Sequence, residues 1–166
     1  MTDTILYQTP RRKPRRDMLA IRAAAMTVGD MRRLICPRPL SSNVVLQPEE
    51  SEAVRVANFL REVTLQGRLN AVWLHVANEA AGGSRTAKLR YAKALNMGMI
   101  PGMADYLFLP QGPAFLCELK VGKGRQNDNQ IAVEKWARET GLHYHLFYSA
   151  GELEQILIDE RVLTNG

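Results

Sequence analysis

The sequence has few cysteines, few aromatic residues and no long hydrophobic run, and each shortage excludes a class of protein. Its two cysteines, Cys36 and Cys117, have no Cys or His neighbours at zinc-binding spacing, so neither a disulfide framework nor a structural zinc site is indicated. The apolar runs are far shorter than the roughly 20 residues that cross a bilayer, so no membrane span is expected. The N-terminus lacks the apolar stretch of a secretory signal, and we therefore expect a cytoplasmic protein.

The composition is that of a folded domain with an uneven distribution of charge. The 166 residues are 46% hydrophobic and 23% charged, which suits one domain of ordinary size. Residues 1–48 carry nine Arg and Lys against three Asp. We therefore expect a flexible basic arm over 1–48 and a folded domain over 49–166. The arm should attract a polyanion without reading sequence, and DNA, RNA or a membrane surface would serve. Its single aromatic residue, Tyr7, argues against a base-stacking platform.

The periodicity beyond the arm predicts alternating helices and strands. Apolar spacing and the positions of Pro and Gly predict helices over 49–66, 84–97, 128–140 and 150–159, and strands over 71–76, 105–109, 114–121 and 142–148. The turn-like segment Pro110–Pro113 predicts a hairpin between the second and third strands. Within the arm, 17–25 and 30–35 could each form a short helix. The order of elements favours an α/β protein with a mixed sheet flanked by helices.

The residues most suited to chemistry lie on this predicted hairpin. Side chains alternate along a strand, so Glu118 and Lys120 point to the same face. A hairpin of this length also places Asp105 across from Glu118, with the two carboxylates converging. Such an oxygen pair suits Mg²⁺ or Mn²⁺. Lys120 adds a cation that could orient a water molecule or neutralise charge that develops on a phosphodiester.

The ordered set of these residues resembles a known family. The string Pro101-Gly-Met-Ala-Asp105, followed by Glu118-Leu-Lys120 and by Gln130 within a helix, is similar to the VRR-NUC (virus-type replication-repair nuclease) family of the PD-(D/E)XK superfamily. The resemblance runs from about Trp73 to about Leu157 and includes the lead-in Trp73–Asn78, Arg85 in a basic helix, and Gly98. The chain departs from the family at Ala104, where Pro is more usual, which leaves the turn less rigid but removes no ligand.

The resemblance implies a fold, an activity and roles for individual residues. The fold would be a restriction-endonuclease-like core of a helix, three strands, a helix and a strand. The activity would be that of a Mg²⁺- or Mn²⁺-dependent endo- or exodeoxyribonuclease acting on flap or branched DNA in replication, repair or recombination. Asp105 and Glu118 would be metal ligands, Lys120 the catalytic lysine, and Gln130 a helix residue that reaches into the site. Members of such folds often have one site per chain, so a homodimer would be needed to act on both strands.

The superfamily also places a carboxylate on the first helix. Glu52 is the first choice because it stands one turn before Val56 on the buried face of the predicted helix. Glu49 is the second choice and Glu79 the third. The sequence alone does not decide between Glu52 and Glu49.

Further polar residues around the motif have a functional and a structural interpretation. The candidates for contact with nucleic acid are His75, Asn78, Arg85, Lys123 and Arg125. His75 and Asn78 could equally cap a strand end, and the basic residues could belong to solvated surfaces. His143 and His145 share one face of a predicted strand and could be a metal pair, but without a third ligand a structural role is favoured.

Two other functions remain open from the sequence. Asp105 could be only a turn residue before a strand, with Glu118 and Lys120 forming an ion pair on an exposed strand face. The protein would then be a non-catalytic nucleic-acid-binding protein of the same fold. In the second alternative the chain is an accessory protein whose basic arm docks an acidic partner.

Overall fold

The computed structural model describes residues 26–39, 41, 43–76 and 85–164. The chain divides into two compact units, Met1–Pro37 and Arg38–Gly166. The described part of the first unit contains one helix, α2 (Val28–Ile35). It begins at a capping box in which Thr27 Oγ1 accepts from the Asp30 amide at 3.1 Å, and the Asp30 carboxylate accepts from the Thr27 amide at 3.3 Å. The expected helix over 30–35 is therefore present with an earlier start, whereas 17–25 lies outside the described residues.

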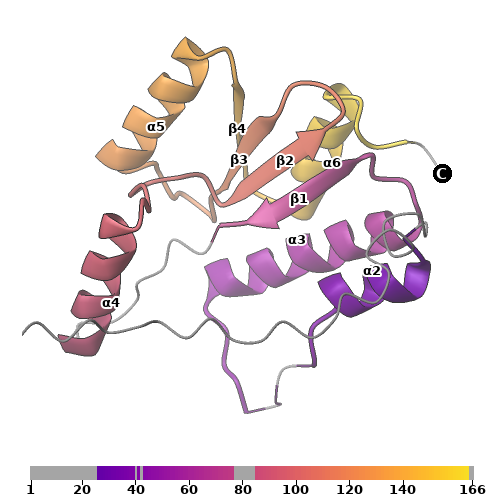
Figure 1. Ribbon diagram of the computed structural model, residues 1–166, viewed down its shortest axis with the longest axis horizontal. Helices are drawn as coiled ribbons and strands as arrows, with labels where there is room; N and C mark the ends of the chain where they lie inside the picture. The colour runs from indigo at the N-terminus through magenta and orange to yellow at the C-terminus, as the bar shows by residue number, and fades with distance from the viewer. Residues whose placement is uncertain (1–25, 40, 42, 77–84, 165–166) are drawn as a thin grey trace, which may run out of the picture. The chain divides into compact units, whose positions relative to one another are not determined.

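The second unit is an α/β structure built on a four-stranded mixed sheet (Figure 1). Its strands follow the order β1-β2-β3-β4, in which β2 is antiparallel to both β1 and β3, and β4 is parallel to β3. The elements are α3 (Pro48–Leu65), β1 (Ala71–His75), α4 (Arg85–Asn96), β2 (Tyr106–Pro110), β3 (Phe115–Leu119), α5 (Asp128–Glu139), β4 (His143–Phe147) and α6 (Ala150–Asp159). This confirms the expected α/β class, the mixed sheet and the hairpin.

Helices cover both faces of the sheet because the strand side chains alternate between two hydrophobic clusters. On one face, α3 and α6 pack against odd-numbered residues of β3, and on the other, α5 packs against even-numbered residues of β3 and β4. The first cluster includes Val56, Leu60, Phe115, Cys117, Phe147, Leu153 and Leu157. The second includes Ala104, Leu116, Val133, Ala137 and Tyr144. None of the described helices combines the length and the apolar character needed to cross a bilayer.

The strand β3 lies between two neighbours and is buried on both faces. All five of its residues are buried. Glu118 is 1% exposed and Lys120, directly after the strand, is 8% exposed. The shared face of Glu118 and Lys120 is confirmed by the 2.7 Å contact between their charged groups. That face is covered by α5 and is not an open strand surface.

Candidate active site

The two carboxylates of the predicted motif meet at one end of the β2–β3 hairpin. Tyr106 pairs with Cys117 in the ladder, so Asp105 and Glu118 are the next residues outward on the two strands. Asp105 Oδ2 accepts a hydrogen bond from the backbone amide of Leu119 at 2.9 Å. The carbonyl of Asp105 also accepts from the Val76 amide at 2.8 Å. The end of β1 and the end of β3 thus both hold Asp105 in place.

Lys120 and Gln130 complete a hydrogen-bonded group around Glu118. Lys120 Nζ donates to Glu118 Oε1 at 2.7 Å and to Gln130 Oε1 at 3.1 Å. Gln130 Nε2 donates to the same Glu118 oxygen. The position of Gln130 follows from the start of α5, where Asn127 Oδ1 accepts from the Gln130 amide and Gln130 Oε1 accepts from the Asn127 amide, each at 3.0 Å. This capping box fixes both Gln130 and the first turn of α5.

The other oxygen of Glu118 is buried and makes no hydrogen bond with the described residues. Glu118 Oε2 has no solvent contact and no partner, which is rare for a buried polar atom. Burial raises the pKa of Glu118 to about 7; the nearby charge of Asp105 acts in the same direction, while Lys120 opposes it. The backbone amide of Asp105 lies near enough to favour the carboxylate form as well, but it is not in hydrogen-bonding geometry with Oε2.

Asp105 experiences the same conflict between burial and charge. Burial raises the pKa of Asp105, and the charge of Glu49 raises it further. The amide of Leu119, then Lys120 and His75, act in the opposite direction. Two neighbouring carboxylates whose charged forms are both disfavoured, with one oxygen left unpartnered, fit a divalent cation that prefers oxygen ligands.

The two first-helix glutamates occupy different environments. Glu52 Oε1 accepts from the Ala150 amide at 3.2 Å, and its Oε2 accepts from Arg55 Nη1 at 2.8 Å. Glu52 thus joins α3 to the N-terminus of α6. Glu49, in the first turn of α3, is the carboxylate whose charge acts on Asp105. Glu49 is therefore the glutamate of α3 whose charge acts on Asp105, whereas Glu52 is held by Ala150 and Arg55. Glu79 lies outside the described residues.

The predicted nucleic-acid contacts lie at several places around this group. The His75 ring packs against Tyr106 with ring centroids 5.0 Å apart, and its charge lowers the pKa of Asp105, so His75 borders the site. Lys123 and Arg125 are exposed in the loop between β3 and α5, and Arg85 is exposed at the start of α4. Asn78 lies outside the described residues.

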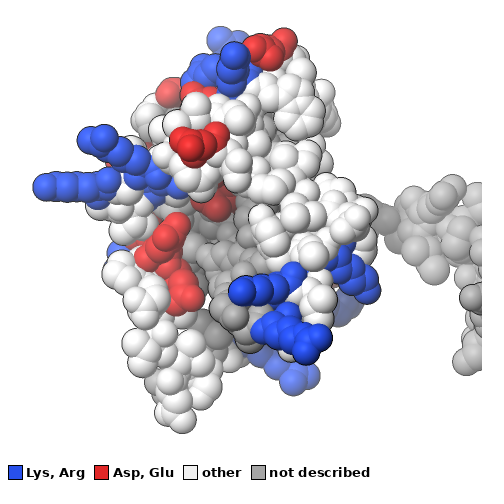
Figure 2. Space-filling model, turned by 90° about the vertical axis from the view of Figure 1, so that its left-hand side faces the viewer, with Lys and Arg blue, Asp and Glu red and all other residues white. Residues whose placement is uncertain are grey.

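The surface around α4 is divided by charge. Figure 2 views the side of the molecule that carries α4 and shows Lys and Arg side chains in separate groups, with Asp and Glu side chains between them. A phosphate backbone can be held by such flanking cations while an acidic centre holds a metal ion.

No family model, curated protein or solved structure showed significant similarity to the chain. Two carboxylates, a buried ammonium group and a fixed amide lie together at one end of the β2–β3 hairpin, and carboxylate pairs of this kind are suited to holding a divalent cation.

Sequence reasoning ranked Glu49 below Glu52 because helical periodicity identifies the buried face of α3 but not what that face contacts. The signal for Glu49 would have been its place in the first turn of α3, from which its charge acts on Asp105. That signal needs the packing of α3 on the sheet to be known first.

Proposed function

We propose that this protein is a Mg²⁺- or Mn²⁺-dependent nuclease that hydrolyses DNA phosphodiester bonds, with a VRR-NUC-like site on a PD-(D/E)XK core. The observation that carries the proposal is the group formed by Asp105, Glu118, Lys120 and Gln130. In that group, the buried oxygen Glu118 Oε2 has no partner among the described residues. A cation between Asp105 and Glu118 would supply what this oxygen lacks.

The arrangement of elements supports the finer fold assignment. From α3 onward the core elements are a helix, three antiparallel strands, a helix and a strand that is parallel to the third, with α4 inserted between β1 and β2. This is the order that the PD-(D/E)XK resemblance implies. The agreement supports the fold independently of the motif residues, because element order follows from the whole chain.

The roles of the residues follow from their contacts. Asp105 and Glu118 would hold the cation, which would polarise the phosphate and lower the pKa of a bound water molecule. The ammonium of Lys120 has three donors, of which two bind Glu118 and Gln130, so one is left for a water molecule or a phosphate oxygen. Gln130 holds that ammonium in position and is itself held by Asn127.

The substrate class follows from the charge around the site. Lys123 and Arg125 follow β3 by a few residues and are exposed, so they are placed to contact phosphates next to the scissile bond. His75, which borders the carboxylate group, would also contact the DNA backbone. Cleavage of both strands of a duplex would require two copies of the chain, because one such carboxylate group is present in the described part of the molecule.

The decisive experiment is cleavage of labelled duplex, single-stranded, flap and four-way-junction DNA in Mg²⁺, Mn²⁺ or EDTA. We expect cutting only with metal. The cleavage rate should fall by at least about 100-fold in Asp105→Asn and in Lys120→Ala. Lys135→Ala is the matched control, because Lys135 is 77% exposed in a surface pair with Glu139. If nothing is cut while DNA binding is equal in wild type and Asp105→Asn, the protein is a nucleic-acid-binding module and the nuclease proposal is wrong.

The same assay distinguishes the two glutamates of α3. Glu49→Gln should weaken Mn²⁺-dependent cleavage, because it removes a carboxylate that acts on Asp105. Glu52→Gln should leave the metal requirement unchanged and lower the thermal midpoint instead, since it weakens the link to Ala150. A raised Mn²⁺ requirement in Glu52→Gln alone would restore Glu52 as the ligand.

A further inference from the structure

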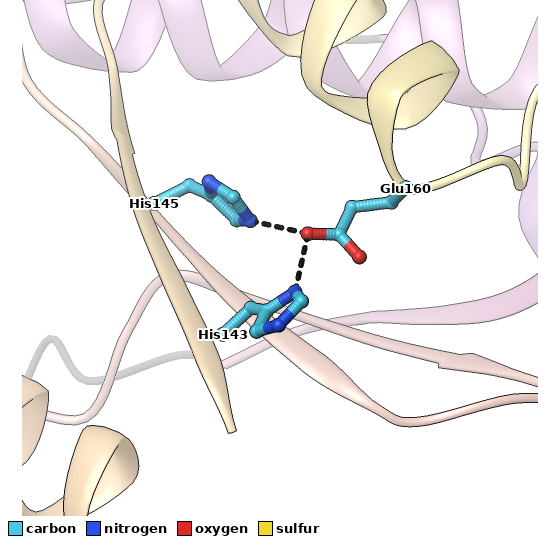
Figure 3. Close-up of side chains that lie close together, drawn as sticks. All are labelled: His143, His145 and Glu160. Atoms are coloured by element: carbon cyan, nitrogen blue, oxygen red, sulfur yellow. Dashed lines mark hydrogen bonds and ion pairs between the residues drawn. The ribbon is translucent and has the colours of Figure 1, made fainter. Parts of the chain in front are cut away.

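Three potential metal ligands converge at β4, the edge strand of the sheet. His143 and His145 lie on the same face of this strand, and Glu160 follows α6. Glu160 Oε1 lies 2.7 Å from His143 Nδ1 and 2.7 Å from His145 Nε2. The ligand atoms of all three residues lie within 4.8 Å of one another (Figure 3). The third ligand that the sequence pattern lacked is thus supplied by a residue 15 positions beyond His145.

The backbone around Glu160 is fixed by the way α6 ends. Glu160 is the C-cap residue, and Arg161 has a positive φ of 58°. The Arg161 amide binds the carbonyl of Ile158 at 2.9 Å and the Val162 amide binds that of Leu157 at 3.0 Å, which is the Schellman pattern. The carboxylate therefore projects from a defined helix end toward β4.

The three side chains are accessible to an ion from solvent. Their exposed fractions are 64% for His143, 30% for His145 and 17% for Glu160. They line a surface hollow together with Arg138, Gly141, Leu142 and Tyr144. Arg138 is the cationic residue among those that line this hollow, but its guanidinium group is bound to Glu134 at 2.8 Å, so its charge is partly neutralised there.

A buried thiol lies on the strand next to the cluster. Cys117 pairs with His145 across the β3–β4 ladder. Burial raises the pKa of the Cys117 thiol, and the charge of Glu160 adds to this effect. The convergent ligand atoms are those of the two imidazoles and the carboxylate, and the thiol is not among them.

We propose that His143, His145 and Glu160 form a binding site for Zn²⁺, separate from the carboxylate site at Asp105 and Glu118. Two imidazole nitrogens and one carboxylate oxygen match zinc, whereas Mg²⁺ prefers oxygen ligands alone. Three protein ligands leave a fourth position open to water in the surface hollow.

The ligand atoms must shift by about an ångström to accept the ion. Tetrahedral ligands about 2.1 Å from zinc lie roughly 3.4 Å from one another, so each 2.7 Å contact to Glu160 must widen by less than an ångström. Ligand atoms at the 4.8 Å limit of the cluster must approach by about 1.4 Å. Each imidazole then offers a lone pair at the nitrogen that now faces Glu160, and its proton resides on the other ring nitrogen. The ion would link the start of β4 to the end of α6, which stabilises the folded state by mass action.

The test is Zn²⁺ titration of the full chain after treatment with a chelator, with excess Mg²⁺ present throughout. We expect one Zn²⁺ per chain, an increase in thermal midpoint, and a loss of affinity of at least about 100-fold in His145→Ala and Glu160→Gln. His75→Ala is the matched control, because His75 is the remaining histidine of the three in the sequence. Asp105→Asn should leave the Zn²⁺ affinity unchanged.

The outcomes separate this proposal from the nuclease proposal. If His145→Ala is unstable, His143→Ala gives the same test, since the His143 side chain is mostly exposed. Absence of Zn²⁺ binding, or binding that is equal in wild type, His143→Ala and Glu160→Gln, overturns the site. Binding that is lost in Asp105→Asn but kept in the histidine variants would place the ion at the carboxylate site and also overturn it.

Discussion

Glu118 is the residue in which stability and proposed function conflict. It occupies the central strand with its carboxylate buried, and only one of its two oxygens is bound by Lys120 and Gln130. A buried charge that is incompletely paired destabilises the folded state. The pKa of about 7, raised from 4.5 chiefly by burial, shows that the folded protein holds a proton on this group far more tightly than the unfolded chain does.

This shift predicts how the stability of the metal-free protein depends on pH. Because the folded pKa is raised, the stabilising contribution is present below the ordinary value of 4.5 and is lost as the pH rises through about 7. In EDTA the free energy of unfolding should therefore fall between pH 5 and pH 7.5, by up to about 3 kcal/mol. Urea unfolding across this range measures the effect.

A matched variant and a metal control isolate this effect. Glu118→Gln cannot titrate, so its stability should change much less over the same interval. Mg²⁺ at pH 7.5 should restore part of the loss in wild type, because the cation favours the charged carboxylates. Parallel pH curves for wild type and Glu118→Gln would show that Glu118 does not titrate in this range.

At the scale of elements, the turn before β2 sets the position of α5. Gly102 has φ +79°, and a Cβ there would lie 2.6 Å from the carbonyl carbon of Asn129 and 2.7 Å from the Gln130 amide. The glycine of the Pro101–Asp105 string therefore allows the turn to touch the first turn of α5. Through this contact the turn determines how far Gln130 reaches toward Lys120 and Glu118.

Substitution of Gly102 should affect both stability and the site. Gly102→Ala combines an unfavourable φ with a steric clash. We therefore expect the free energy of unfolding to fall by about 2–4 kcal/mol and the cleavage rate to fall as well. Gly141→Ala is the control, because Gly141 has φ +81° but nothing within 4 Å of the added Cβ. Gly141→Ala should lower the free energy of unfolding by about 1–2 kcal/mol without changing the rate of cleavage by the folded protein. Equal effects of the two substitutions in urea unfolding would show that the contact with α5 is unimportant.

At the scale of the whole molecule, the excess positive charge and the proposed active site lie in different parts of the chain. The formal net charge is +5, and the excess of Arg and Lys lies in the first 48 residues, whereas the carboxylate group lies in the second unit. A basic segment of this kind raises affinity for any nucleic acid without adding to catalysis.

Neutralising the basic cluster should therefore weaken DNA binding but not the cutting step. Replacement of Arg11, Arg12, Lys13, Arg15 and Arg16 by Gln brings the formal net charge from +5 to zero. We expect weaker binding in fluorescence anisotropy, and a salt dependence whose slope falls by about 0.9 for each phosphate that the cluster no longer neutralises. The cleavage rate at saturating DNA should not change. A salt dependence equal to that of wild type would show that the cluster does not bind DNA and would favour an acidic protein partner for it.

The order of elements and most of the carboxylate site could be predicted from the sequence. Strand alternation placed Glu118 and Lys120 on one face, and the turn Pro110–Pro113 placed Asp105 opposite Glu118. The position of the Gln130 side chain follows from a local capping box with Asn127. These features depend on residues close in the chain, where period, turn type and capping determine geometry.

The remaining contacts were decided by tertiary packing. Glu52 binds Ala150 across 98 positions, and Glu160 meets His143 across 17, and no local pattern encodes either separation. Both contacts depend on where α6 lies, which is set by the burial of Leu153 and Leu157 against α3 and the sheet. Hydrophobic burial is not directional, so the sequence determined that α6 would pack by its apolar face, and only the folded structure decided which polar groups its two ends would meet.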